Sequence, residues 1–325
     1  MRILVTGGSG FIGTNLLELL VSLEYDVLNL DIAKPRNLAH LKYWKFCNIL
    51  DINQLSIAIN DFNPNILFHL AARTDLNGKS IGEYSENTVG VKNLISSVKG
   101  LKELHKIIFA SSRLVCKIGY QPINDCDYCP STFYGESKVI GEQIVWSSVD
   151  HLKPCVCIVR PTSIWGPWFS HPYKDFFLTI ANNRYFHPGD LTISKSFGFV
   201  GNTVFQLIKL MQAPSNLVDR KTFYLADYPP IDLTAMANEI QVALKARRIK
   251  SINIYILKLA AKFGDLLKFI GWPNPPLTSF RLNNLVTPMV YDLDPLSQIS
   301  GSLPYSLNQG IKNTVCWLID ENEIN

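Results

Sequence analysis

The first 22 residues hold the pattern that restricts the fold most. A short apolar run, "RILVT", is followed by a glycine-rich turn and an apolar helical pattern, "GGSGFIGTNLLELL". Gly7, Gly10 and Gly13 suit a tight strand-to-helix turn, a close approach of backbone to a pyrophosphate, and close packing of helix on strand. Free amides at the start of a helix near Phe11 attract an anion. We therefore expect a βαβ unit that binds a dinucleotide.

The next apolar run, "DVLNLD", ends at Asp31, eighteen residues after Gly13. A carboxylate at this place accepts hydrogen bonds from the adenosine ribose hydroxyls and repels a 2′-phosphate. This favours NAD over NADP as the cofactor. Lys34 and Arg36 follow closely and could offset part of the repulsion, so NADP stays an alternative.

Apolar runs continue to alternate with helical patterns along the chain. The expected strands are "YWKFCNI", "NILFHLAA", "KIIFASS" and "CVCIVRP", and later "TFYLAD". Such alternation is typical of an α/β protein with a doubly wound parallel sheet, the Rossmann arrangement. We expect an NAD-binding domain over residues 1–165 plus 197–226, and a smaller, mainly C-terminal substrate domain over 166–196 plus 227–325.

Composition argues against several other classes. The 325 residues have a net charge of +4 and no Lys/Arg tract, so we expect no nucleic-acid partner. We find no signal peptide and no long uncharged apolar window, so we expect no membrane span and a cytoplasmic location. Seven cysteines then indicate reduced thiols. Cys126 and Cys129 have metal-type spacing without a second pair, so we expect no metal site.

Residues 252–271 form the most apolar long segment. Lys258, Lys262 and Lys268 recur in it at helical spacing and predict an amphipathic helix with a mainly basic stripe. A surface helix packed on its own domain is the favoured interpretation. Contact with a membrane surface is the alternative.

The stretch "FYGESKVIGEQ" places Tyr134 four residues before Lys138. This spacing puts both side chains on one face of a helix, where they can meet a common ligand. Tyr-x-x-x-Lys alone is a weak signal, because a chain with 13 tyrosines contains about one by chance. Its weight comes from the other motifs.

Five motifs occur in a characteristic order: "TGGSGFIG", "HLAA", "SSRLV", "YGESK" and "RPTSIWGP". In this order they resemble the extended short-chain dehydrogenase/reductase family, and most closely its NAD-dependent sugar-nucleotide epimerase/dehydratase branch. The resemblance implies that Ser112, Tyr134 and Lys138 are catalytic. It also implies a cofactor site formed by Gly7, Gly10, Phe11, Ile12, Gly13, Asp31, Ile32, Asn48, Ile49, Leu70, Ala71, Ala72, Asn87, Tyr134, Lys138, Pro161 and Thr162.

The three implied catalytic side chains have the chemical properties that proton removal from an alcohol requires. A free phenol has a pKa near 10, too high for an efficient base at neutral pH. We expect the Lys138 ammonium and the positive nicotinamide ring to lower the pKa of Tyr134, which requires about 4 kcal/mol for three units. Ser112 can hold the reacting oxygen of the substrate.

The residues after Ser112 bear on the type of reaction. The dehydratases of the branch that this chain resembles have an acidic residue just after the equivalent serine. In this chain Arg113 and Leu114 follow Ser112, and neither side chain can act as a general acid. We therefore predict an epimerase that oxidises a sugar transiently and returns the hydride. A nucleotide-activated sugar, UDP- or GDP-linked, is the expected substrate, with Ser112, Lys195 and Arg281 in its site. Synthesis of cell-surface polysaccharide precursors is the expected setting.

Several departures from the branch leave the substrate open. Cys116–Lys117 replaces Tyr-Gly, Asn48 stands where Asp is common, and Lys195–Ser196 replaces Arg-Asp. An NAD(P)H-dependent reductase of a keto-sugar or another ketone is an alternative, as is a non-catalytic nucleotide sensor. The resemblance also implies a homodimer formed through the helices near 83–99 and 134–150, although burial under the chain's own sheet would give the same apolar faces.

Overall fold

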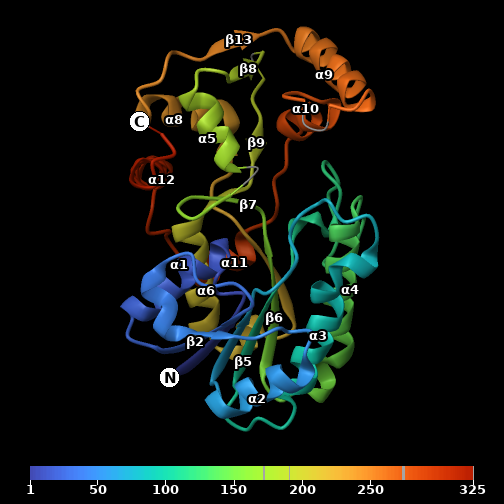
Figure 1. Cartoon of the computed structure of the whole chain (residues 1–325), viewed down its shortest axis with the longest axis vertical. Helices are drawn as coiled ribbons and strands as arrows, with labels where there is room; N and C mark the ends of the chain where they lie inside the picture. Colours follow the sequence, from blue (N-terminus) through green and yellow to red (C-terminus); the bar gives the residue numbers. More distant parts are fainter. Residues whose placement is uncertain (171–172, 190, 273–274, 325) are drawn as a thin grey trace.

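The computed structural model describes residues 1–170, 173–189, 191–272 and 275–324. Its main sheet has seven strands, and every pair of neighbours in it is parallel (Figure 1). The strand order across the sheet is β3 (Trp44–Phe46), β2 (Asp26–Asp31), β1 (Arg2–Thr6), β4 (Ile66–His69), β5 (Lys106–Ala110), β6 (Cys155–Pro161) and β11 (Lys221–Leu225).

Helices cover both faces of this sheet. The helices α1 (Phe11–Ser22) and α6 (Val200–Gln212) lie on one face, and α2 (Ile52–Phe62), α3 (Ser85–Val98) and α4 (Phe133–Ser148) lie on the other (Figure 1). Ile3 and Val5 of β1 belong to the core on the α1 side, and Leu4 belongs to the core on the α2 side. A strand buried on both faces has no polar face, which explains its unbroken apolar run. The predicted doubly wound parallel sheet is confirmed.

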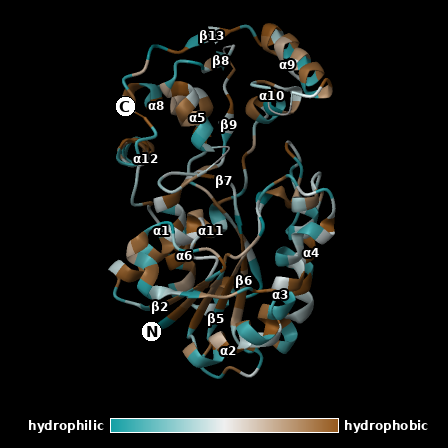
Figure 2. Ribbon diagram, viewed as in Figure 1, coloured by the Kyte–Doolittle hydropathy of each residue, from teal (hydrophilic) through white to brown (hydrophobic). Residues whose placement is uncertain are grey.

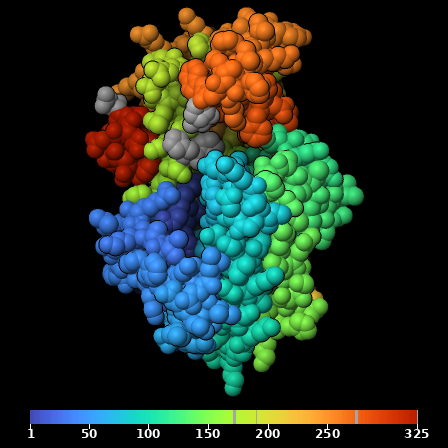
Figure 3. Space-filling view, turned by 45° about the vertical axis from the view of Figure 1, so that its right-hand side comes forward, coloured from blue at the N-terminus to red at the C-terminus, as the bar shows by residue number. Residues whose placement is uncertain are grey.

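The order of the strands creates the crevice that ligands use in such folds. From β1 the chain builds outward to β2 and β3, then crosses back to build β4, β5 and β6 on the other side. Connections therefore diverge at the carboxyl ends of β1 and β4. The surface is hollowed between the N-terminal residues (blue) and the segment after β4 (cyan) in Figure 3.

The remaining elements gather mainly beyond the carboxyl ends of the sheet strands, where they form a smaller lobe (Figure 1). Three two-stranded ribbons, β10 with β7, β12 with β9, and β13 with β8, tie these segments together. The elements are β7 (Ser163–Trp165), α5 (Tyr173–Ala181), β8 (Phe186–Pro188), β9 (Ser194–Lys195), β10 (Phe197–Phe199), β12 (Ile231–Asp232), α8 (Leu233–Ala243), β13 (Lys250–Ile252), α9 (Ile254–Phe269), α10 (Ser279–Val286), α11 (Asp294–Ser300) and α12 (Leu307–Asp320). The short helix α7 (Ser215–Val218) lies instead at the amino end of β6, where the Arg220 amide donates to the Val156 carbonyl.

The strand β11 rejoins the main sheet beside β6, in the segment 197–226 that was predicted to return to the cofactor domain. The domain boundaries themselves stay a prediction, and residues 171–172, 190, 273–274 and 325 of the expected substrate domain lie outside the described residues. Within the described ranges, no helix combines the length and the apolar character that crossing a bilayer requires.

Local sequence explains where α4 begins. The Thr132 hydroxyl accepts a hydrogen bond from the Gly135 amide at 3.0 Å, so it caps the helix. The predicted helix 134–150 is thus α4 followed by a short 3₁₀ turn, Val149–His151. This start places Tyr134 in the first turn, at the edge of the sheet where the crevice opens.

Candidate active site

A cavity of about 930 Å³ lies at the carboxyl ends of the sheet strands. It collects residues from the chain's first glycines to α10, and most of the predicted site residues line it. Those residues are Gly7, Gly10, Phe11, Ile12, Gly13, Asp31, Ile32, Asn48, Ile49, Leu70, Ala71, Ala72, Ser112, Tyr134, Lys138, Pro161, Thr162 and Arg281. Asn87 and Lys195 are buried close by but do not line this cavity.

The glycine turn forms one end of the cavity. Gly7 has a positive φ of 76°, and a Cβ at this position would lie 2.5 Å from the Ala71 amide nitrogen. A Cβ at Gly13 would lie 2.4 Å from the Gly7 carbonyl oxygen. Only glycine fits either place, so the turn packs directly on the segment after β4 while the start of α1 faces the cavity. This cradle fits the pyrophosphate of a dinucleotide.

Asp31 ends β2 at the rim of the same cavity. Its carboxylate accepts hydrogen bonds from the Ser9 amide at 3.0 Å and the Ala33 amide at 2.9 Å. Burial raises the pKa of Asp31, and these amides oppose that change. A carboxylate has about four acceptor positions, so Asp31 can still accept from ribose hydroxyls. Lys34 and Arg36 also line the cavity, as expected from their positions.

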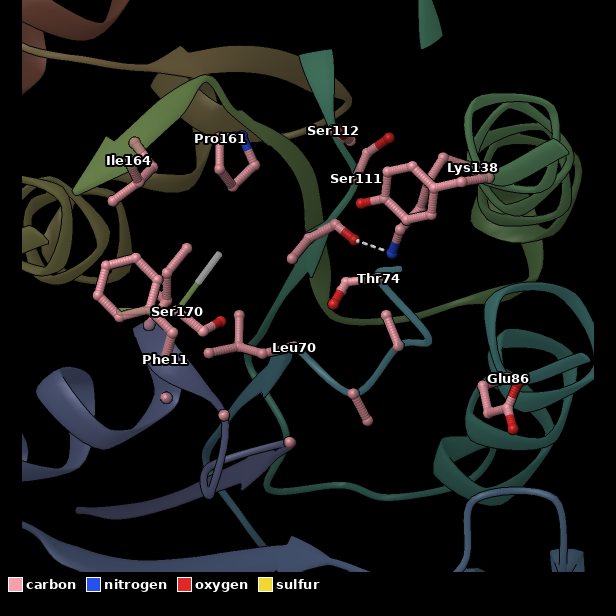
Figure 4. A pocket seen from close by; sticks show the side chains of 18 of the residues that line it. Phe11, Leu70, Thr74, Glu86, Ser111, Ser112, Lys138, Pro161, Ile164 and Ser170 are labelled. Carbon is pink, nitrogen blue, oxygen red and sulfur yellow. Dashed lines mark hydrogen bonds between the residues drawn. The ribbon is translucent and has the colours of Figure 1, made fainter. Parts of the chain in front are cut away.

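Ser112, Tyr134 and Lys138 come together from two elements. Ser112 follows β5, and the other two residues lie on adjacent turns of α4. Figure 4 shows Ser111 and Ser112 beside Lys138, with Phe11, Leu70 and Ser170 across the cavity. All three predicted catalytic side chains are less than one-tenth exposed.

The structure corrects one prediction about these groups. Burial raises the pKa of Tyr134 to about 12, while a hydrogen bond with Ser112 acts in the lowering direction. In the protein alone the pKa of Tyr134 is therefore raised rather than lowered, because desolvation outweighs the opposing interactions, and Lys138 is not among the groups that affect this pKa most. The contribution of a nicotinamide ring stays a prediction.

Lys138 is itself strongly affected by its surroundings. Its ammonium donates a hydrogen bond to the Ala110 carbonyl at 3.0 Å, at the end of β5 (dashed in Figure 4). Burial lowers the pKa of Lys138 to about 8, and the charge of Glu142 partly opposes this. The hydrogen bond therefore fixes the Lys138 ammonium beside the cavity, and the negative charge of Glu142 offsets only part of the cost of burying it.

Asn87 joins the two sides of the site from behind. Its side-chain oxygen accepts from the Arg73 amide at 3.0 Å, and its amide nitrogen donates to the Arg73 carbonyl at 3.0 Å and to Ser137 Oγ at 2.9 Å. These bonds link the segment after β4 to α4 next to Lys138. Asn87, expected at the cofactor site, thus holds the backbone at Arg73 behind the cavity.

Of the two cationic side chains expected to bind the substrate, Arg281 lines the cavity and Lys195 does not. Arg281 lines the cavity and donates to the Pro275 carbonyl at 2.8 Å. Lys195 is 6% exposed, and its ammonium donates to the Asn284 carbonyl. Asn284 lines the cavity, so in this structure Lys195 supports the wall rather than forming it.

Sequence reasoning did not assign a site role to several residues that line the cavity. Arg113, treated there only as a residue unable to act as an acid, is buried in the wall against Tyr173 and Tyr291. Glu86 of α3 also lines the cavity, and its Oε2 atom is buried with no hydrogen-bond partner among the described residues. No local pattern distinguishes this glutamate from an ordinary first-turn residue of a helix. Within the described ranges, no three His, Cys, Asp or Glu side chains are grouped as metal ligands.

Comparisons with known proteins agree with this geometry. The model of the NAD dependent epimerase/dehydratase family matches residues 3–226. The chain is 25% identical, over 97% of its length and 94% of the other, to N-acetyl-alpha-D-glucosaminyl-diphospho-ditrans,octacis-undecaprenol 4-epimerase of Escherichia coli O157:H7. It is 24% identical to 2-alkyl-3-oxoalkanoate reductase of Stenotrophomonas maltophilia, over 96% and 98% of the two chains. The structure of UDP-glucuronic acid 4-epimerase from Bacillus cereus in complex with NAD matches with a TM-score of 0.74 and 19% identity, covering 99% of each chain.

Proposed function

Because the chain belongs to the NAD-dependent epimerase/dehydratase family, we propose that it is an epimerase of a sugar carried on a diphosphate. The observation that carries this proposal is the meeting of Ser112, Tyr134 and Lys138 on the wall of one cavity with the glycine turn. Binding, proton transfer and cofactor contact can then take place at one site.

The residues beside Ser112 support epimerisation over elimination of water. Arg113 and Leu114 line the cavity and cannot donate a proton at neutral pH. Among the described residues that line the cavity, the carboxylates are Asp31 and Glu86. Asp31 lies at the cofactor end, since its carboxylate holds the glycine turn through Ser9.

The proposed mechanism uses the protein groups as follows. Bound NAD supplies the chemistry of accepting a hydride from a sugar carbon and returning it. Tyr134 removes the proton of the sugar hydroxyl and returns it at the end of the cycle. Ser112 hydrogen-bonds the same oxygen and steadies the charge that develops on it. Lys138 would hold the ribose hydroxyls of the cofactor, and with the positive nicotinamide ring bound beside Tyr134 the two charges together would favour the ionised phenol.

An epimerase must hold the diphosphate firmly while the sugar turns over. Arg281 lines the cavity wall, which supports its proposed role in binding a phosphate, and the buried Arg113 lines the same cavity. A nucleoside diphosphate sugar, UDP- or GDP-linked, is the first candidate substrate. The full-length similarity to the E. coli epimerase makes a sugar diphosphate on a polyprenol the second.

A reductase is the second candidate function. It is favoured by the similarity to 2-alkyl-3-oxoalkanoate reductase over nearly the whole of both chains. Such an enzyme uses the same phenol to protonate a ketone oxygen and consumes one reduced cofactor per turnover.

We also propose that the protein is a cytoplasmic homodimer whose two subunits contact each other through α3 and α4. Analytical sedimentation measures whether the dimer forms.

The deciding experiment is incubation with NAD and a panel of sugar diphosphates, with products read by proton NMR. The panel contains UDP- and GDP-sugars and N-acetylglucosaminyl diphospho-undecaprenol in detergent. Inversion of one ring carbon without net change of NAD is expected, and Tyr134→Phe should lower kcat by about 10²–10⁴. Tyr43→Phe, outside the cavity lining, is the matched control.

Other outcomes select other functions. Consumption of NADH or NADPH with a ketone, and no inversion of any sugar, would identify a reductase. Equal turnover by Tyr134→Phe and wild type would leave no catalytic role for the phenol and would favour the nucleotide sensor.

A further inference from the structure

The helix α9 leaves a wide apolar face uncovered. Ile256, Leu259, Phe263, Leu266 and Ile270 recur at spacings of three or four and are 61%, 71%, 60%, 53% and 69% exposed. They define the α9 apolar face. Phe269 and Trp272, at the end of the helix, are also exposed. Phe280 is exposed on α10, which packs against α9. Figure 2 shows the hydrophobic (brown) segments of α9 at the outer edge of the smaller lobe.

The opposite side of α9 is fixed in place. Ala261 and Gly264 are buried there, where α9 packs on α10 and the segment before it. A Cβ at Gly264 would lie 1.7 Å from the Leu277 carbonyl oxygen, so the helix and this segment are in direct backbone contact. Because this side is bound so closely, the apolar face cannot turn inward without breaking the packing. The predicted packing of the helix on its own domain thus involves only one narrow side.

Basic residues accompany the apolar face. Between positions 245 and 272 the chain has seven Lys and Arg residues and one acidic residue, Asp265, whereas its overall net charge is only +4. Lys258 and Lys262 are exposed on α9 directly beside the apolar stripe, and Lys245, Arg247, Arg248 and Lys250 are exposed just before it. Apolar and aromatic residues on one face with lysines along its border are typical of helices that lie at a bilayer surface.

The position of α9 matters for the cavity. The helix lies with β13 and β8 at the end of the molecule opposite α2 (Figure 1). Its neighbour α10 carries Phe280, Arg281 and Asn284 into the cavity lining, and Phe280 is 59% exposed. A surface that binds α9 therefore comes close to the cavity mouth.

We propose that the α9 apolar face binds the surface of a phospholipid bilayer that contains anionic lipids. The apolar side chains enter the boundary between headgroups and acyl chains, and the flanking lysines contact the negative headgroups. A second copy of the chain fits this face less well, because symmetric docking would bring two strongly basic segments together. Binding of the bilayer goes beyond the proposed function and does not depend on turnover of any sugar.

The test is co-sedimentation of the full-length protein with vesicles. Vesicles of phosphatidylcholine alone are compared with vesicles that also contain phosphatidylglycerol, at low and at high salt. Binding is expected to the anionic vesicles and to weaken with salt. The variant Leu259→Glu/Phe263→Glu should bind at least about tenfold more weakly, since it puts two charges in the middle of the apolar face. Ile57→Glu, which changes an equally exposed apolar residue on α2, should bind like wild type.

Circular dichroism and thermal unfolding show whether the double variant folds, which is expected because both replaced side chains are more than half exposed. Lack of wild-type binding to anionic vesicles, or equal binding by the double variant, would overturn the proposal. So would a wild-type dimer in sedimentation that the double variant converts to a monomer, because the face would then be a subunit interface. None of these readouts involves a sugar substrate, so the proposed reaction can fail while bilayer binding holds, and the reverse.

Discussion

Glu142 of α4 and Arg160 of β6 form an ion pair in which Oε2 and Nη2 lie 2.7 Å apart and each side chain is 1% exposed. The contact is bidentate, because Arg160 Nε also donates to Glu142 Oε1 at 2.9 Å. Glu142 lies one turn after Lys138, and its charge favours the ammonium of that lysine. The pair thus joins the helix that carries the candidate catalytic residues to the sheet.

Replacing Glu142 with Gln should destabilise the protein by about 3–5 kcal/mol. The substitution keeps the shape but removes the carboxylate that is paired with the buried Arg160 guanidinium. Urea unfolding measures the change. Glu136→Gln, on the exposed side of the same helix, is the control and should stay within about 0.5 kcal/mol of wild type. Equal midpoints for Glu142→Gln and wild type would show that the pair contributes nothing to stability.

The cofactor-free protein should contain no Tyr134 phenolate in the neutral range. Burial raises the pKa of this phenol to about 12, so it stays protonated through pH 10. The near-ultraviolet tyrosinate absorbance of wild type and Tyr134→Phe should therefore differ only above about pH 11. With NAD added, wild type should gain absorbance at pH 9 that the variant lacks, because a nearby positive ring favours phenolate. A difference at pH 8 without NAD would contradict the dominance of burial.

Asp31 should set the preference between the two dinucleotides. Asp31→Ala removes an acceptor for the ribose hydroxyls and a negative charge that repels a 2′-phosphate, while Lys34 and Arg36 remain in the cavity lining. We expect about tenfold weaker NAD binding and a larger ratio of NADP to NAD affinity, measured by calorimetry. Asp26→Asn, at the exposed start of the same strand, is the matched control. An unchanged ratio would show that another residue discriminates.

The features of this structure that could be predicted from the sequence are those encoded within short stretches of it. The strand runs, the glycine turn and the spacing of Tyr134 and Lys138 lie within short stretches of sequence, and the structure places them as expected. The direction of the Tyr134 pKa in the protein alone was missed because it depends on burial of the phenol and on its interaction with Tyr173, which lies 39 residues away in the sequence. The role of Lys195 was unclear for the same reason, since its partner Asn284 lies 89 residues away.

Buried polar groups were the hardest part of the site to predict. The Glu142–Arg160 pair joins a helix to a strand across 18 residues of sequence. Arg160 is the first residue of "RPTSIWGP" and Glu142 follows "YGESK", but neither motif indicates that the two side chains pair. The exposure of α9 also depends on tertiary structure. Its amphipathic pattern predicts two different faces, but only the packing of Ala261 and Gly264 shows that the larger apolar face points outward.

His69 should make the protein sensitive to mild acid. The imidazole is fully buried at the end of β4, and its Nδ1 lies 2.7 Å from the Thr6 hydroxyl. Burial lowers the pKa of His69 to about 3, and the positive charge of Lys138 acts in the same direction. The folded pKa lies below the unfolded value of about 6.5, so this contribution to stability is present above pH 6.5 and is lost as the pH falls toward 3.

The size of this acid effect follows from the two pKa values. At pH 5 the unfolded histidine is charged and the folded one is neutral, which should reduce the free energy of unfolding by about 2 kcal/mol relative to pH 7. Urea unfolding of His69→Gln should lack this part of the pH dependence, whereas His151→Gln, at an exposed position, should keep it. If His69→Gln does not fold, proton NMR of the wild type gives the same answer, since the His69 ring signals should not titrate above pH 4. A His69 titration midpoint near 6.5 would contradict the inference, because it would mean that the ring is hydrated or paired in a way that this buried geometry does not provide.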